Sequence, residues 1–193
     1  MKNTNVVKKE IAKEVSKEIP STIITPKGRL SYPHLLTRNT EGNYPSDKYE
    51  TLLLIPKTED ISVLVKACEA VLMDMFSDEY AGLDQLKNPP VRDGDEKGGE
   101  YAGHWFIKAK SDNRPAIVGP NPKVVIDSPE LVYGGQNARL SLSVYGYKKP
   151  GNKGIAFGLK NVQILGGGEP FGGGSGDPAS QFPTEQEGVN DNF

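Results

Sequence analysis

Residues 104–110 alternate between apolar and polar side chains with a period of two, which predicts a β-strand. One face carries Trp105, Ile107 and Ala109. The other face combines an aromatic ring with ionisable groups: His104, Phe106, Lys108 and Lys110, with Arg114 in the turn that follows. A ring beside a row of cations can stack a base and hold its phosphates, although an ordinary half-buried strand with a solvated lysine face gives the same pattern. The alternation does not say which face is buried, and in the opposite orientation Trp105 would take the place of Phe106.

A second predicted strand, residues 136–147, has the same character. Its apolar face carries Leu140, Leu142 and Val144, which suits a core. Its other face is polar and aromatic, and basic residues follow it: Arg139, Tyr145 and Tyr147, then Lys148, Lys149 and, across a turn, Lys153. Two strands with this bias are harder to explain as solvated surface than one. Together they predict a groove in which tyrosines stack on bases and cations neutralise phosphates.

The remaining pattern predicts a small, mainly β domain. Three more strands are expected at residues 28–32, 48–55 and 153–165, and the broad apolar stripe of residues 59–76 predicts one helix, capped by Thr58 or Asp60. Five strands with glycine-rich turns favour an OB-type barrel with an inserted helix. We expect three parts: an N-terminal arm (1–20), the OB-fold-like domain (21–165) and a flexible tail (166–193).

The N-terminal arm places Val7, Ile11, Val15 and Ile19 four residues apart, between lysines and glutamates. This spacing predicts a short amphipathic helix that ends before Pro20. Either the arm is frayed, or it contacts another subunit. The sequence leaves homo-oligomerisation open.

Charge is distributed unevenly along the chain, although the net charge is only −2. Residues 166–193 contain five acidic residues and no Lys or Arg, so residues 1–165 carry all 23 basic residues and 20 of the 25 acidic ones. The tail is glycine-rich and ends in an acidic segment with a terminal aromatic residue. We expect Asp191 and Phe193 to bind a partner protein, and the tail to compete with a nucleic acid for the basic face. A purely solubilising tail is the alternative.

Other functional classes find little support in the sequence. The single cysteine, Cys68, excludes an internal disulfide and a zinc site built from several thiolates, and we expect no metal, no other cofactor and no enzymatic activity. The Asp93-Gly-Asp-Glu96 cluster lacks the spacing of a calcium loop, which makes a metal-dependent nuclease a remote alternative. No signal peptide or membrane-span pattern is present, so a soluble, cytosolic protein without membrane contact is expected.

Several stretches of the chain together resemble a family of tailed-phage single-stranded DNA-binding proteins with an OB fold, first known as a domain of unknown function. They include Gly28-Arg-Leu-Ser-Tyr-Pro-His-Leu35, Arg92-Asp-Gly-Asp-Glu-Lys97 and Val132-Tyr-Gly-Gly135, and the other matching stretches are 48–57, 86–91, 101–111, 114–115 and 151–163. The resemblance implies single-stranded DNA binding in phage replication or recombination, in the cytoplasm of the host cell. An acidic tail ending in Phe is also similar to the C-terminal tips of bacterial and phage single-strand binders, which recruit replication proteins.

We therefore expect a sequence-tolerant single-stranded DNA-binding protein. The residues expected to contact DNA are Phe106, Lys108, Lys110, Arg114, Arg139, Tyr145, Tyr147, Lys148, Lys149 and Lys153. The alternative is a structural or recombination-adaptor module whose strands pack against a protein partner.

Overall fold

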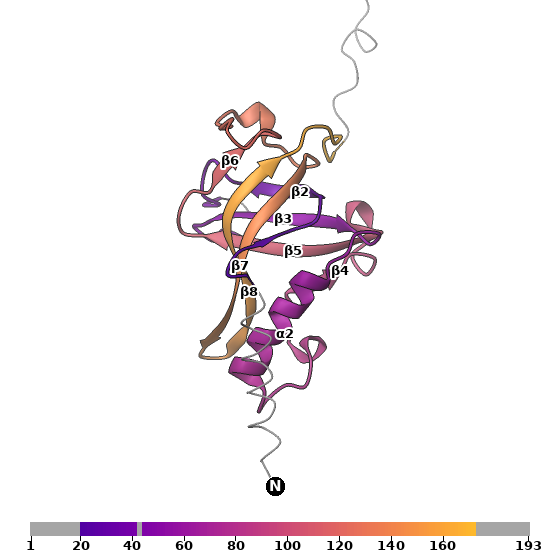
Figure 1. Ribbon diagram of the computed structural model, residues 1–193, viewed down its shortest axis with the longest axis vertical. Coiled ribbons are helices and arrows are strands. Elements are labelled where there is room, and N and C mark those ends of the chain that lie inside the picture. Colours follow the sequence, from indigo (N-terminus) through magenta and orange to yellow (C-terminus); the bar gives the residue numbers. More distant parts are fainter. Residues whose placement is uncertain (1–19, 42–43, 173–193) are drawn as a thin grey trace, which may run out of the picture.

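The computed structural model describes residues 20–41 and 44–172, and five long strands in it close a barrel (Figure 1). They are β2 (Gly28–His34), β3 (Tyr49–Pro56), β5 (His104–Ser111), β7 (Asn137–Lys149) and β8 (Asn152–Ile164). Their order around the barrel is β2-β3-β5-β8-β7, and β7 pairs with β2 to complete the ring. All of these pairings are antiparallel except that of β5 with β8. The expected five-stranded, OB-like barrel is confirmed.

Three short strands extend the sheet, and three 3-10 turns lie in the connections between strands. The strands are β1 (Ile23–Ile24), β4 (Val91–Asp93) and β6 (Ala116–Val118), which pair with β7, β5 and β8 respectively. The turns are η1 (Leu83–Gln85), η2 (Gly99–Tyr101) and η3 (Pro129–Leu131). Segments of two or three residues are too short to show a hydrophobic period, so the sequence did not predict them.

The helix α2 (Ser62–Phe76) begins three residues later than expected. Asp60 accepts hydrogen bonds from the backbone N–H and the hydroxyl of Ser62, so one of the two proposed capping residues does hold the first turn. The helix lies beside the part of the β7–β8 hairpin that extends past the barrel (Figure 1). Contact with the hairpin is close at Gly146, where a Cβ atom would lie 2.3 Å from the sulfur of Met75.

The structure settles which face of β5 is buried, a point that the alternation left open. Ile107 and Ala109 are fully buried in the main core, while Lys108 and Lys110 are on the outer face. Trp105 lies at the end of the strand, with the Lys57 ammonium 4.9 Å from its ring centroid. Ile107 and Ala109 fill the inner face of β5, so binding of DNA by its outer face stays the prediction.

Residues just beyond the expected domain boundary at residue 165 contact the barrel. Residues 166–172 fold back on the barrel, where the Phe171 N–H donates to the Gly134 carbonyl and the Arg29 guanidinium lies 4.2 Å from the Phe171 ring centroid. Arg29 also donates to the carbonyl oxygens of Gly135 and Glu169. Residues 166–172, the first seven of the expected tail, thus pack on the domain, because the Phe171 ring covers the apolar cluster of Leu54, Tyr101 and Phe106.

Across the residues that the structure describes, no helix is long and apolar enough to cross a membrane.

Candidate nucleic-acid interface

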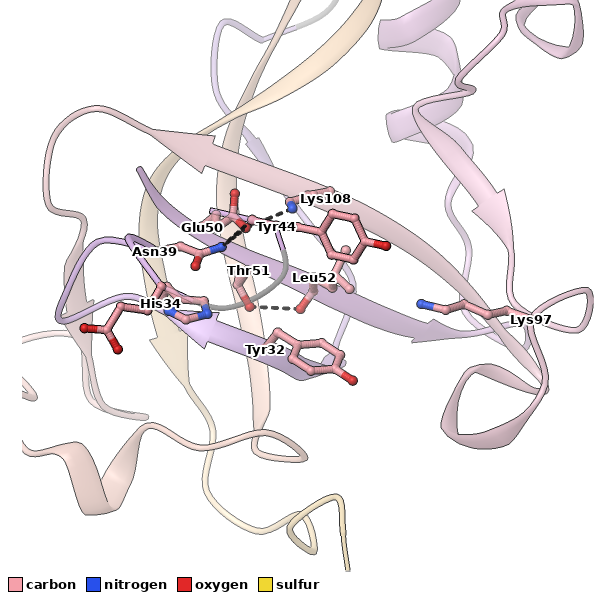
Figure 2. Close-up of a pocket in the computed structure, with 10 residues that line it drawn as sticks. Tyr32, His34, Asn39, Tyr44, Glu50, Thr51, Leu52, Lys97 and Lys108 are labelled. Atoms are coloured by element: carbon pink, nitrogen blue, oxygen red, sulfur yellow. Dashed lines mark hydrogen bonds and ion pairs between the residues drawn. The ribbon is translucent and has the colours of Figure 1, made fainter. Parts of the chain in front are cut away.

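A cavity of about 630 Å³ opens over the outer face of β2, β3 and β5, and we call it the Tyr32 groove. Its lining is mainly aromatic and polar, and includes Tyr32, His34, Asn39, Tyr44, Lys97 and Lys108. In Figure 2 the rings of Tyr32 and Tyr44 and the ammonium of Lys97 extend into the space over β3. Two rings with accessible faces beside two lysines provide the elements needed to stack bases and contact phosphates.

Tyr32 reaches this groove because β2 is irregular at that point. The pairing of β2 with β3 shifts register between Ser31 and His34, and Tyr32 has a φ of 48°. A non-glycine residue in the left-handed region is strained by about 1–3 kcal/mol, and such strain concentrates at functional sites. The result is a tyrosine that is 67% exposed, and Tyr44 in the following loop is 86% exposed.

A second cavity, of about 320 Å³, continues from the first, and we call it the Tyr145 groove. It is lined by Arg92 and Pro89 on one side and by β5 and the β7–β8 hairpin on the other. Four residues predicted from the sequence meet here: Lys108, Lys110, Tyr145 and Tyr147. Lys108 lines both cavities, so the two grooves meet at this residue.

Lys108 and Lys110 are held in place by the buried carboxylate of Glu50, which is only 5% exposed. The two lysine Nζ atoms lie 2.9 and 2.8 Å from its oxygens, and Asn39 and Ser46 also donate to it. Burial alone would raise the pKa of Glu50, but the hydrogen bonds from both lysines, Ser46 and Asn39 outweigh burial and hold the pKa at about 2. Glu50 therefore orients the two cations and cancels half of their charge.

Arg92 is a cation without a carboxylate partner among the residues described. Its guanidinium lies 4.5 Å from the centroid of the Phe106 ring, and its Nε atom is buried without a hydrogen-bond acceptor. Burial lowers the pKa of Arg92, but a guanidinium remains charged in proteins. A half-buried guanidinium that has no carboxylate partner among the described residues favours an anionic ligand, because charge-assisted hydrogen bonds from its accessible N–H groups would offset the cost of burying the charge. Arg92 therefore marks the Tyr145 groove as an anion-binding surface.

Phe106 is on the predicted face of β5 but is 6% exposed. Its ring packs edge-on against Tyr101 at 5.2 Å between centroids and lies beneath Arg92 and Lys97. Together with Leu54 it forms a small second core on the outer face. A base could stack on Phe106 only if Arg92 and Lys97 moved, so stacking by this residue stays a prediction.

The other predicted residues do not line the two grooves. Arg114 forms an ion pair with Asp127, and Arg139 is exposed far along β7 from Tyr145. Lys148 and Lys153 both pair with Glu79 just beyond α2, and Lys149 is exposed beside the hairpin turn. Asp191 and Phe193 lie outside the described residues.

Sequence reasoning missed five groove residues: Tyr32, His34, Tyr44, Arg92 and Lys97. Four of them fall within the stretches that carried the family resemblance, which was the available signal. Strand alternation could not find Tyr32, because the bulge interrupts the period at that residue. Tyr44 lies in a polar loop with no periodic pattern.

The Asp93–Glu96 cluster has a structural role in this fold. Lys57 Nζ lies 2.7 Å from a carboxylate oxygen of Asp93 and 2.5 Å from one of Asp95, and Asp95 also accepts from the Gly103 N–H. The intervening Gly94 has no room for a side chain, since a Cβ atom would lie 2.1 Å from the Tyr101 carbonyl oxygen. Within the described ranges no three His, Cys, Asp or Glu side chains converge as metal ligands would.

The fold and the grooves define a class of protein. In OB folds, nucleic acids bind across the second and third barrel strands, between the loop joining strands one and two and the loop joining strands four and five. The corresponding parts here are β3 and β5, residues 35–48, and the tip of the β7–β8 hairpin. The two grooves are lined by β3, β5, the loop after β2 and the part of the β7–β8 hairpin below its tip, so the chain has the layout of an OB-fold nucleic-acid-binding protein.

Comparison with known proteins gives the family. A family model described as "Enterobacter phage Enc34, ssDNA-binding protein" matches residues 21–193. The chain belongs to this family. A search of curated protein sequences finds none that matches the chain.

Solved structures agree with this assignment. The chain is similar to the single-stranded DNA-binding protein from bacteriophage Enc34, with 26% identity, a TM-score of 0.63, and coverage of 83% of this chain and 89% of that one. The same phage protein in complex with ssDNA matches with 26% identity and a TM-score of 0.62, over 79% of this chain and 90% of that one. The single-stranded DNA-binding protein gp2.5 of bacteriophage T7 shares the fold, with 15% identity and a TM-score of 0.53, over 76% and 92% of the two chains.

Proposed function

We propose that this protein binds single-stranded DNA without sequence preference, along the Tyr32 and Tyr145 grooves, during phage DNA replication or recombination in the host cytoplasm. The unpaired, half-buried guanidinium of Arg92 carries the proposal, because it favours a phosphate where the two grooves approach each other. Membership of a family described by its single-stranded DNA-binding protein supports it.

Each groove contributes rings and cations to the proposed binding. Tyr32 and Tyr44 would stack bases in one groove, and Tyr145 and Tyr147 in the other, which requires no particular base because every base has a π-face. Arg92, Lys97, Lys108 and Lys110 would contact phosphates. The protein acts as a binder, without catalysis and without a cofactor.

A salt titration tests this function directly. If Arg92, Lys97 and the Lys108–Lys110 pair, whose charge Glu50 half cancels, together neutralise three phosphates, the affinity for fluorescent oligo-dT should fall with a slope of about −2 in log K against log salt, since each contact contributes about −0.7. Duplex DNA of the same length should bind more weakly at every salt concentration. Salt-independent binding, or a preference for duplex, would contradict the proposal. Co-purification of a partner protein with no oligonucleotide binding at low salt would favour the adaptor function instead.

We also propose that the acidic tail recruits replication or recombination proteins through Asp191 and Phe193, and that it competes with DNA for the grooves. The position of Phe171 supports competition: Phe171 packs on the same small cluster of Leu54, Tyr101 and Phe106 as Leu52, which lines the Tyr32 groove, so the last described residues lie near that groove.

Truncation after residue 172 should therefore tighten oligo-dT binding, because four acidic residues are removed next to the cations. The measurement is the Kd of the two chains at low and high salt, and the difference should shrink as salt increases. The matched control keeps the length of the tail and removes only its charge, by replacing Asp177, Glu185, Glu187 and Asp191 with the corresponding amides. This variant should show the same gain in oligo-dT affinity as the truncated chain. If the full and the truncated chain bind oligo-dT with equal affinity at low salt, the tail does not compete with DNA for the grooves.

A further inference from the structure

A groove of about 270 Å³, lined by apolar side chains and Ser21, lies on the side of α2, apart from the residues that line the two DNA grooves. Its walls are Pro20 and Ile23 at the start of the described chain, Ala67, Ala70 and Val71 on α2, and Val144 on β7. Ala67 and Ala70 have small side chains, which allow the backbone of another helix to come close. The groove is thus shaped to receive an apolar helix surface.

The apolar surface continues along α2 on either side of this groove. Val63, one turn before Ala67, is 50% exposed, and Met75, one turn after Val71, is 37% exposed. These four residues, 63, 67, 71 and 75, form a ridge at a spacing of four. Ala67 is buried, but the other three side chains of the ridge are at least partly exposed. Exposed apolar side chains aligned along one ridge indicate a surface that packs against another element.

The N-terminal arm carries a matching ridge. Val7, Ile11, Val15 and Ile19 have the same spacing and span the same number of residues, and two ridges at this spacing interdigitate in a common mode of helix packing. Residues 1–19 also contain five lysines and three glutamates, while the described helix has Glu69 and Asp74 against Lys66. The arm and α2 therefore carry net charges of opposite sign. The family match begins at residue 21, so the arm is additional to the family domain.

We infer that residues 5–19 form a helix that docks its Val7–Ile19 ridge on the Val63–Met75 ridge of α2 in the same molecule. The start of the described chain favours docking within one molecule, because Pro20 is itself a wall of the groove. A segment attached directly at its binding site has an effective concentration in the millimolar range, which a second molecule at micromolar concentration does not reach.

Cysteine cross-linking in the full chain tests the docking. Val15→Cys is combined with Val63→Cys in one variant and with Met75→Cys in another, since the arm could run toward either end of α2. Treatment with a short bis-maleimide should give, in one of the two variants, an intramolecular link at monomer mass. The native Cys68 does not compete, because it is fully buried and burial raises its pKa to about 12. Val15→Cys with Glu69→Cys, on the polar face of α2, is the control and should not link.

Two outcomes would overturn the inference: linked dimers, which would show that the arm docks on a second copy, and the absence of any link above the control. A second measurement does not depend on the register of the two helices. Replacing Val7, Ile11 and Val15 by serine should lower the thermal unfolding midpoint by about 4 °C or more, whereas replacing Lys9 and Lys13 by serine should not. Equal midpoints for both variants would also contradict docking. Neither result depends on DNA binding.

Discussion

Replacing both Tyr32 and Tyr44 by alanine is expected to weaken binding of oligo-dT by at least about thirty-fold. Loss of stacking costs about 1–3 kcal/mol per base, and each of these rings projects into the Tyr32 groove with an accessible face. The measurement is the Kd for fluorescent oligo-dT at one fixed salt concentration. Because both side chains are largely exposed, the free energy of unfolding should change little.

The matched control replaces both tyrosines by phenylalanine, which keeps the rings and removes only the hydroxyl groups. This variant should bind with nearly the affinity of the original chain. Replacing Tyr145 and Tyr147 by alanine tests the other groove in the same way. If the Tyr32 and Tyr44 alanine variant is folded and binds normally, the Tyr32 groove does not hold DNA.

Replacing Glu50 by glutamine is expected to have opposite effects on stability and on DNA binding. Removing one partner of a buried ion pair destabilises a protein by about 3–5 kcal/mol, and here two lysines would be left beside each other without a counter-ion. The same change leaves Lys108 and Lys110 with one more uncancelled positive charge. The Kd for oligo-dT at low salt should therefore fall, and the slope of log K against log salt should become steeper by about 0.7. Urea unfolding and a salt titration measure the two effects separately. Weaker DNA binding by a folded variant would mean that Glu50 acts by orienting the lysines more than by neutralising them.

The pH dependence of stability gives an independent test of the same carboxylate. The pKa of Glu50 is about 2 in the folded chain, below its ordinary value of 4.5, so its ionised form stabilises the fold above pH 4.5. This contribution, on the order of 3 kcal/mol, decreases as the pH falls from 4.5 toward 2. The Glu50→Gln variant lacks it, so the difference in unfolding free energy between the two chains should be largest above pH 5 and shrink in acid.

The sequence predicted the barrel strands because their apolar residues alternate regularly. Ile107 and Ala109 share one face, as the period predicted, and the structure shows that this face is the buried one, while the paired lysines on the other face of β5 do line a groove. The same local pattern could not predict burial on that outer face. Phe106 is covered by Tyr101 and Arg92, which reach it from the connection between α2 and β5. Such contacts depend on the path of a loop, and a loop leaves no periodic signal.

The sequence also could not show which basic residues are free to contact phosphates. Counting lysines along β7 and the following hairpin suggested phosphate contacts at Lys148 and Lys153, but both form ion pairs with Glu79, which is distant in sequence. Arg92 lies in a stretch that appears acidic, yet its neighbours Asp93 and Asp95 are engaged with Lys57. These ion pairs join residues that are distant in sequence, and they decide which cations remain available for a ligand. The order of charges along the chain does not show such pairs.

The strand order around the barrel has a consequence for the synthesis of the chain. β8 is the last strand to be made, and it lies between β5 and β7, so the ring stays open until residue 164 has left the ribosome. The pairing of β2 with β7 likewise joins the two ends of the domain. Contacts this distant in sequence form slowly, because the entropy of closing long loops is lost before the contacts stabilise the fold. During translation the lysine-rich outer face of β5 is therefore exposed before its barrel exists, and Glu50, made some sixty residues earlier, is already present to pair with it.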